Sequence, residues 1–108
     1  MTIEEIKQLR ETEDKVEFKQ ARIQFNYGNG RKSVLGYVVA LANEGGGKLI
    51  LGVTESSNPP HVISGSKAFE GEEGKLEQDI YRDLKVRVRT EVLYEETKRV
   101  LVIHINSR

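Results

Sequence analysis

Gly-Gly-Gly-Lys-Leu-Ile-Leu-Gly-Val, at residues 45–53, carries the strongest structural signal in the chain. Residues 48–53 form a short, nearly continuous apolar run, which is typical of a strand buried on both faces of a sheet. The three glycines before this run follow a helical pattern, and glycine readily takes the left-handed conformation in which helices end. We therefore predict a helix that returns sharply into a buried strand.

The segments on either side of this strand predict a mixture of helices and strands. Residues 31–44 place Val34, Val38 and Leu41 on one face of a helix, and Leu76, Ile80 and Leu84 recur every four positions in a second helix over 72–85. Further elements are a short helix over 3–10, an extended segment over 15–27, a brief strand over 61–63, and strands over 86–94 and 100–105. This mixture predicts an α+β fold, a two-layer sandwich with two main helices packed on a mixed sheet.

The composition limits the class of protein. With 108 residues the chain has the size of a single domain, residues 1–108, and it stops at Arg108 directly after a strong strand, so we expect the N-terminal module of a longer protein. The absence of cysteine excludes disulfides and thiolate zinc sites. No apolar run approaches the roughly 20 residues that cross a bilayer. We therefore expect a cytoplasmic protein without a membrane partner.

The charge balance is neutral, with 17 basic and 17 acidic side chains, so nucleic-acid binding can rest only on local clusters. Arg87 and Arg89 are two residues apart, which places both on one side of a strand, where they form a track for phosphates. The candidate phosphate contacts are Lys19, Arg22, Arg31, Lys32, Arg87 and Arg89.

Acidic side chains support a different chemistry. Glu17 enters the first strand and Glu55 follows the glycine-anchored strand, so the two carboxylates stand at the ends of strands that could be neighbours. Carboxylates in that position can hold a divalent cation such as magnesium or manganese, as phosphodiester cleavage often requires. Solvated salt bridges are the alternative explanation for the same residues.

Several short motifs together resemble the Schlafen-type Alba-like domain. These are Val16-Glu17-Phe18-Lys19, Ala40-Leu41-Ala42-Asn43 with Gly46-Gly47, Leu49-Ile50-Leu51-Gly52-Val53, and Gly65. Their order and spacing match the family over about residues 9–107. The resemblance implies a DNA-binding module of a bacterial transcriptional regulator, with DNA preferred over RNA, no cofactor, and a homodimer as the assembly to consider.

The Schlafen branch of the family implies an alternative, a metal-dependent endoribonuclease with three carboxylates. Glu17 and Glu55 match two of its acids, while Thr12 stands at the third position, between Glu11 and Glu13, and Thr54 stands where an acid is common. The nuclease would use Glu17, Glu55 and either Glu13 or Glu11, with the metal on Glu17 and Glu55. A further alternative is an oligomerisation or effector-sensing domain.

Overall fold

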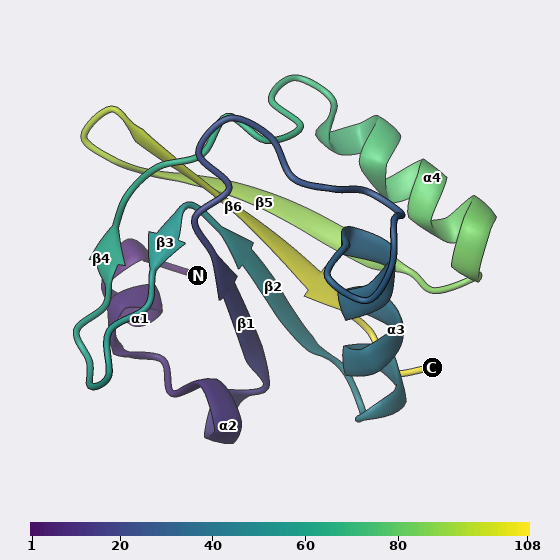
Figure 1. Ribbon diagram of the computed structural model, residues 1–108, viewed down its shortest axis with the longest axis horizontal. Helices are drawn as coiled ribbons and strands as arrows, with labels where there is room; N and C mark the ends of the chain where they lie inside the picture. Colours follow the sequence, from purple (N-terminus) through teal and green to yellow (C-terminus); the bar gives the residue numbers. More distant parts are fainter.

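The computed structural model describes residues 1–108, except for the side chain of Thr12. Its centre is a four-stranded sheet with the strand order β1-β2-β6-β5 (Figure 1). β1 runs parallel to β2, whereas β2 and β5 each pair with β6 in antiparallel fashion. The strand bounds are Val16–Lys19 for β1, Gly47–Leu51 for β2, Val88–Glu95 for β5 and Lys98–Ile105 for β6. The predicted α+β fold with a mixed sheet is therefore confirmed.

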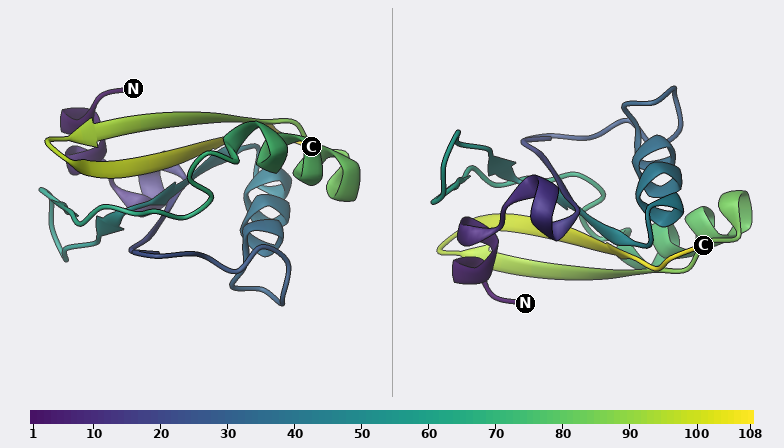
Figure 2. Two further views of the ribbon diagram at one scale, coloured as in Figure 1. Left: turned by 90° about the horizontal axis from the view of Figure 1, so that it is seen from above. Right: turned by 90° about the horizontal axis from the view of Figure 1, so that it is seen from below.

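Two helices cover one face of this sheet, α3 (Val34–Asn43) and α4 (Glu73–Leu84). Figure 2 shows both helices beside the same end of the β5–β6 hairpin. Alternate residues of the central strands point to them and form an apolar core with the two helices. Its buried members include Val38 and Leu41 of α3, Leu76 and Ile80 of α4, Leu49 and Leu51 of β2, and Leu101 and Ile103 of β6.

Shorter elements cover the opposite face of the sheet. They are α1 (Ile3–Gln8) and the separate two-stranded pair β3 (Val53–Thr54) and β4 (Val62–Ile63). A second core forms there from the side chains that point away from α3 and α4, including Phe18, Ile50 and Val102. Because both faces of the central strands are buried, these strands read as continuous apolar runs in the sequence. A one-turn helix, α2 (Glu11–Asp14), joins α1 to β1.

The helix starts follow from side-chain caps. Thr2 and Glu5 form the reciprocal capping box of α1, with the Thr2 hydroxyl accepting from the Glu5 backbone N–H. Ser33 caps α3 by accepting from the Gly36 N–H at 3.0 Å. Because this cap fixes the first turn, α3 begins at Val34, and the predicted start at residue 31 is three residues too early.

The turn before β2 needs glycine, both for its backbone conformation and for lack of space. Gly45 and Gly46 have φ values of 102° and 103°, in the left-handed region that favours glycine. Gly47 has no room for a side chain, because a Cβ there would overlap the Lys15 carbonyl oxygen and touch the Leu41 side chain. The close packing of this turn agrees with the predicted sharp return from a helix into a buried strand.

Two predicted strands are shorter than their patterns indicated. The extended segment 15–27 is a strand only to Lys19, since Ala21 takes a φ of 46° and residues 20–33 form a loop. Its later apolar residues pack against the α3–α4 core without joining the sheet. The run 48–53 is divided into β2 and β3 at Gly52, which has a φ of 107°.

Candidate nucleic-acid interface and carboxylate cluster

Three glutamates from separate segments meet beside β1. Glu17 lies on β1, on the face that α3 covers, because its neighbours Val16 and Phe18 belong to the opposite core. Glu11 comes from α2, and Glu55 follows β3. The carboxyls of Glu55 and Glu17 both lie close enough to the Glu11 carboxyl to raise its pKa. The structure thus brings together the three acids Glu11, Glu17 and Glu55, whereas Glu13 is exposed on α2.

The surroundings of the Glu11 carboxyl raise its pKa. Its hydrogen bond with Glu55, its partial burial and its contact with Glu17 raise the pKa of Glu11 to about 8. The physical cause is that like charges at hydrogen-bonding distance cannot all ionise, so one carboxyl keeps a proton that the others accept. The raised pKa of Glu11 could not be predicted from the sequence, because it depends on the approach of α2 to β1.

Glu11 and Glu17, but not Glu55, line a pocket of about 330 Å³ between β1 and α3. Tyr37 of α3 and Glu44, which directly follows α3, form its other wall, and Lys15 donates to the Glu44 carbonyl oxygen at 2.6 Å. Within the described part of the chain, no group of three or more His, Cys, Asp or Glu side chains is placed to hold a metal ion. We therefore derive no metal-dependent step from these carboxyls.

Three of the predicted basic residues lie around the start of α3. Lys19 lies over the Tyr37 ring, 5.1 Å from its centroid, and its Nζ is 3.3 Å from Glu17 Oε1. A hydrogen bond with Tyr37 and the nearby Glu17 outweigh burial and raise the pKa of Lys19. Arg31 and Lys32 are exposed just before the Ser33 cap, and Arg31 lines an apolar depression that also includes Tyr37. Tyr37 was not among the predicted site residues. It lies beside Lys19 and lines the same depression as Arg31.

Arg87 and Arg89 have different neighbours. β5 begins at Val88, so only Arg89 lies within it, 4.0 Å from Glu91. Arg87 precedes the strand and lies over the ring of Tyr81 on α4, 4.6 Å from its centroid. The phosphate track through these two residues stays a prediction, and each of its side chains already lies beside another group.

Arg22 stands apart from the other predicted contacts. It lies in the loop 20–33 near the end of β1, and its backbone oxygen accepts from the Lys67 N–H at 2.9 Å. Among the described side chains, Arg22, Arg31 and Lys32 form no ion pair with a carboxylate. The six predicted basic residues are thus divided between the start of α3, the end of β1 and the region around β5.

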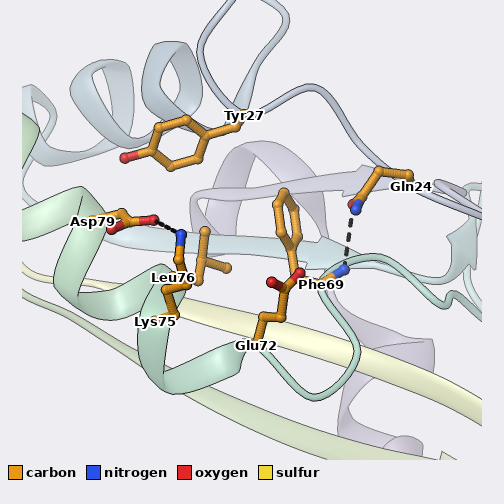
Figure 3. Close-up of a pocket in the computed structure, with 7 residues that line it drawn as sticks. All are labelled: Gln24, Tyr27, Phe69, Glu72, Lys75, Leu76 and Asp79. Atoms are coloured by element: carbon orange, nitrogen blue, oxygen red, sulfur yellow. Dashed lines mark hydrogen bonds and ion pairs between the residues drawn. The ribbon is translucent and has the colours of Figure 1, made fainter.

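The loop 20–33 is fastened to α4 at a small polar pocket of about 260 Å³ (Figure 3). Tyr27 and Gln24 face Phe69 and α4 across this pocket, and the Gln24 side-chain oxygen accepts from the Phe69 N–H at 3.3 Å. The Tyr27 hydroxyl donates to Asp83 at 2.7 Å, and burial together with this carboxylate raises the pKa of Tyr27. These contacts hold the segment that carries Arg22, Arg31 and Lys32.

The fold and these residues define an α+β domain with a mixed four-stranded sheet and an acidic cluster beside its parallel edge. The profile of the Schlafen, AlbA_2 family matches residues 12–108, and the chain belongs to this family. No curated protein sequence matches the chain. No helix among the described residues is both long enough and apolar enough to cross a membrane.

Two solved structures are similar to this fold. The NMR structure of the N-terminal domain of a RecG-related protein from Nitrosomonas europaea has a TM-score of 0.59 and 23% identity, and the match covers 97% of this chain and 70% of that one. The crystal structure of the DIP2311 protein from Corynebacterium diphtheriae has a TM-score of 0.60 and 21% identity over 88% of this chain. The matched region makes up only 18% of the DIP2311 chain.

Proposed function

We propose that this chain is a nucleic-acid-binding module that binds DNA within a bacterial transcriptional regulator. The observation that carries the proposal is the group of basic side chains on the loop 20–33, Arg22, Arg31 and Lys32. They are exposed and, in the described part of the chain, have no carboxylate partner. Such side chains can contact phosphates without first giving up an internal ion pair.

The relatives support this proposal at the level of family and fold. The chain belongs to the Schlafen, AlbA_2 family, and one similar structure is described as part of a protein related to the ATP-dependent DNA helicase RecG. A match that makes up a small part of the DIP2311 chain supports a module that works within longer proteins. Proteins of one fold can have unrelated functions, so the proposal rests on the basic residues.

The six basic residues contribute unequally in this proposal. Arg31 and Lys32 are exposed directly before α3 and have no carboxylate partner among the described residues. Lys19 and Arg89 each lie near a glutamate, so their net attraction for phosphate is smaller. We expect Arg31 and Lys32 to be the principal contacts, with Arg22 next.

The test compares duplex DNA binding by the parent and by an Arg31→Ala/Lys32→Ala variant, using fluorescence anisotropy at ~50 mM salt. Each lost phosphate contact should flatten the salt dependence of binding by about one unit. Lys75→Ala is the matched control, because Lys75 is an exposed lysine of α4 that is paired with Asp79. Equal binding by all three proteins would reject this surface, and no binding by the parent would reject the function.

A second candidate function is a metal-dependent endoribonuclease, which the convergence of Glu11, Glu17 and Glu55 favours. Among the described residues no group of three or more His, Cys, Asp or Glu side chains is placed to hold a metal ion, so we rank this function second. The test incubates transfer RNA with the protein and magnesium or manganese, beside a Glu17→Gln variant. Cleavage by the parent but not by the variant would establish the nuclease, and no cleavage by either would exclude it for this substrate.

A further inference from the structure

A basic pocket lies beside Arg22, near the start of the loop 20–33. Arg31 and Lys32, at the other end of this loop, do not line it. It has a volume of about 310 Å³ and lies between residues 64–67 and the turn that joins β5 to β6. The side chains of Arg22, Lys67 and Lys98 line it, and Tyr94 and Thr97 form its rim on the hairpin. Of these residues, only Arg22 was selected from the sequence, because the others come together through the packing of three separate segments.

The pocket has an excess of positive charge. No described carboxylate forms an ion pair with Arg22, Lys67 or Lys98, and Glu70 is the one acidic residue in the lining. Arg99 lies at the base, but its guanidinium is already neutralised by Glu73 at 2.7 Å. Three cations against one carboxylate, in a concave site, attract an anionic ligand.

Backbone hydrogen bonds build this pocket before any ligand binds. The Lys67 N–H donates to the Arg22 carbonyl oxygen at 2.9 Å, and the Ser66 N–H donates to the Arg99 carbonyl oxygen at 2.7 Å. The Ser66 hydroxyl donates to Ala21 at 2.5 Å. These bonds tie the loop after β1, the segment after β4 and strand β6 to one another, so the three cations hold their relative positions.

One polar group in the lining has no partner. The Ser64 hydroxyl oxygen is buried and forms no hydrogen bond with any described group. An unsatisfied buried hydroxyl is unusual in a folded protein and calls for an explanation. Rotation of the Ser64 side chain toward the pocket would let this hydroxyl donate to an anionic oxygen there.

Tyr94 supplies a flat apolar surface at the same pocket. Its side chain is 58% exposed, although it is a large aromatic residue on a regular strand opposite Arg99. Exposed aromatic rings beside a positively charged groove are the usual platform on which unpaired nucleic-acid bases stack. In a duplex the faces of internal bases are covered by neighbouring bases. Such a ring can therefore stack with the bases of a single strand but not with those inside a duplex.

We propose that this pocket binds a single-stranded segment of nucleic acid. A backbone phosphate lies between Lys67, Lys98 and Arg22, and an unstacked base lies on the Tyr94 ring. This inference rests on the proposed nucleic-acid-binding function and adds to it a second site, separate from Arg31 and Lys32, that recognises strands whose bases are unpaired.

The experiment measures binding of a labelled oligothymidylate of about 12 nucleotides by fluorescence anisotropy at ~50 mM salt, because one such groove covers roughly 4–16 nucleotides. Tyr94→Leu removes the ring while keeping an apolar side chain, and should weaken binding by about 5- to 100-fold. Tyr94→Phe keeps the ring and should bind like the parent. Lys67→Ala and Lys98→Ala should each flatten the salt slope by roughly 0.7, the value for one phosphate on a single strand.

Lys75→Ala serves as the charge control, since Lys75 lies on α4 outside this pocket. Parent-like binding by Tyr94→Leu and by both lysine variants would overturn the pocket while leaving the proposed function standing. If the parent binds duplex DNA but not the oligothymidylate, the single-strand inference alone is wrong. If the parent binds neither, the proposed function itself fails, and the two failures are thereby distinguished.

Discussion

Arg99 Nη2 lies 2.7 Å from Glu73 Oε2, so a buried guanidinium of β6 is held by the first residue of α4. The Arg99 side chain is only 4% exposed, and its Nη1 also donates to the carbonyl oxygens of Ser66 and Ala68 at 3.0 and 2.9 Å. This one side chain therefore joins the sheet, the segment before α4 and α4 itself.

Glu73→Gln should destabilise the domain by about 3 kcal/mol, because it leaves the Arg99 charge buried without its counter-ion. The value stands at the low end for such pairs because Glu73 itself is 24% exposed. Urea unfolding followed by circular dichroism measures the change. Glu72→Gln, on the neighbouring exposed residue, is the control, and an equally small effect of both substitutions would show that Arg99 does not depend on Glu73.

Gly47→Val should lower the free energy of unfolding by roughly 1–3 kcal/mol, the usual cost of forcing a side chain into a filled space. The new side chain would overlap the Lys15 carbonyl oxygen and the Leu41 side chain. Gly74→Ala is the matched control, because a Cβ at Gly74 meets nothing within 4 Å and lies in α4, where alanine favours the helix. A Gly47→Val protein as stable as the parent would show that the turn does not need close packing.

The raised pKa of Glu11 predicts a specific pH dependence of stability. Between its ordinary value of 4.5 and about 8, the folded state holds a proton that the unfolded state has lost. Stability should therefore fall as the pH rises through this window. Glu11→Gln mimics the neutral acid and should gain stability relative to the parent between pH 5 and pH 8, measured by urea unfolding. If the two proteins differ in free energy of unfolding by the same amount at every pH from 5 to 8, Glu11 is ionised in the folded state.

Tyr27→Phe should release the loop 20–33 from α4 by removing the hydrogen bond to Asp83, which measures 2.7 Å. We expect a loss of about 0.5–1.5 kcal/mol in stability. Because the loop carries Arg31 and Lys32, DNA affinity should fall as well, measured by anisotropy. Unchanged affinity with the expected loss of stability would show that binding does not depend on this attachment.

The sequence was sufficient for the helices and the central strands, because caps and periodicity are local signals. Thr2 identifies the start of α1, and the run 48–53 locates the buried strand. The start of α3 was predicted three residues too early, because the cap by Ser33 was not recognised. The end of β1 and the break at Gly52 could not be predicted, since positive φ values at Ala21 and Gly52 are set by packing of distant segments. Such tertiary effects commonly override local patterns.

The candidate sites divide in a similar way. The family resemblance implied Glu17 and Glu55 with either Glu13 or Glu11, and in the structure Glu11 lies near the other two and has a raised pKa. The phosphate track through Arg87 and Arg89 stays a prediction, and the structure adds that Arg87 packs on Tyr81 and that Arg89 lies near Glu91. Lys67, Lys98 and Tyr94 come from separate segments, and nothing in their local sequence indicates that they share a pocket.

The salt dependence of duplex DNA binding tests the central claim most directly. With four to six phosphate contacts, the logarithm of the binding constant should fall with the logarithm of the salt concentration at a slope of about −4 to −5 between ~50 and ~200 mM. Anisotropy titrations of the parent protein give this slope. A slope in that range supports a phosphate-binding surface, whereas no binding at ~50 mM salt, or a slope near zero, would contradict duplex DNA binding by this domain.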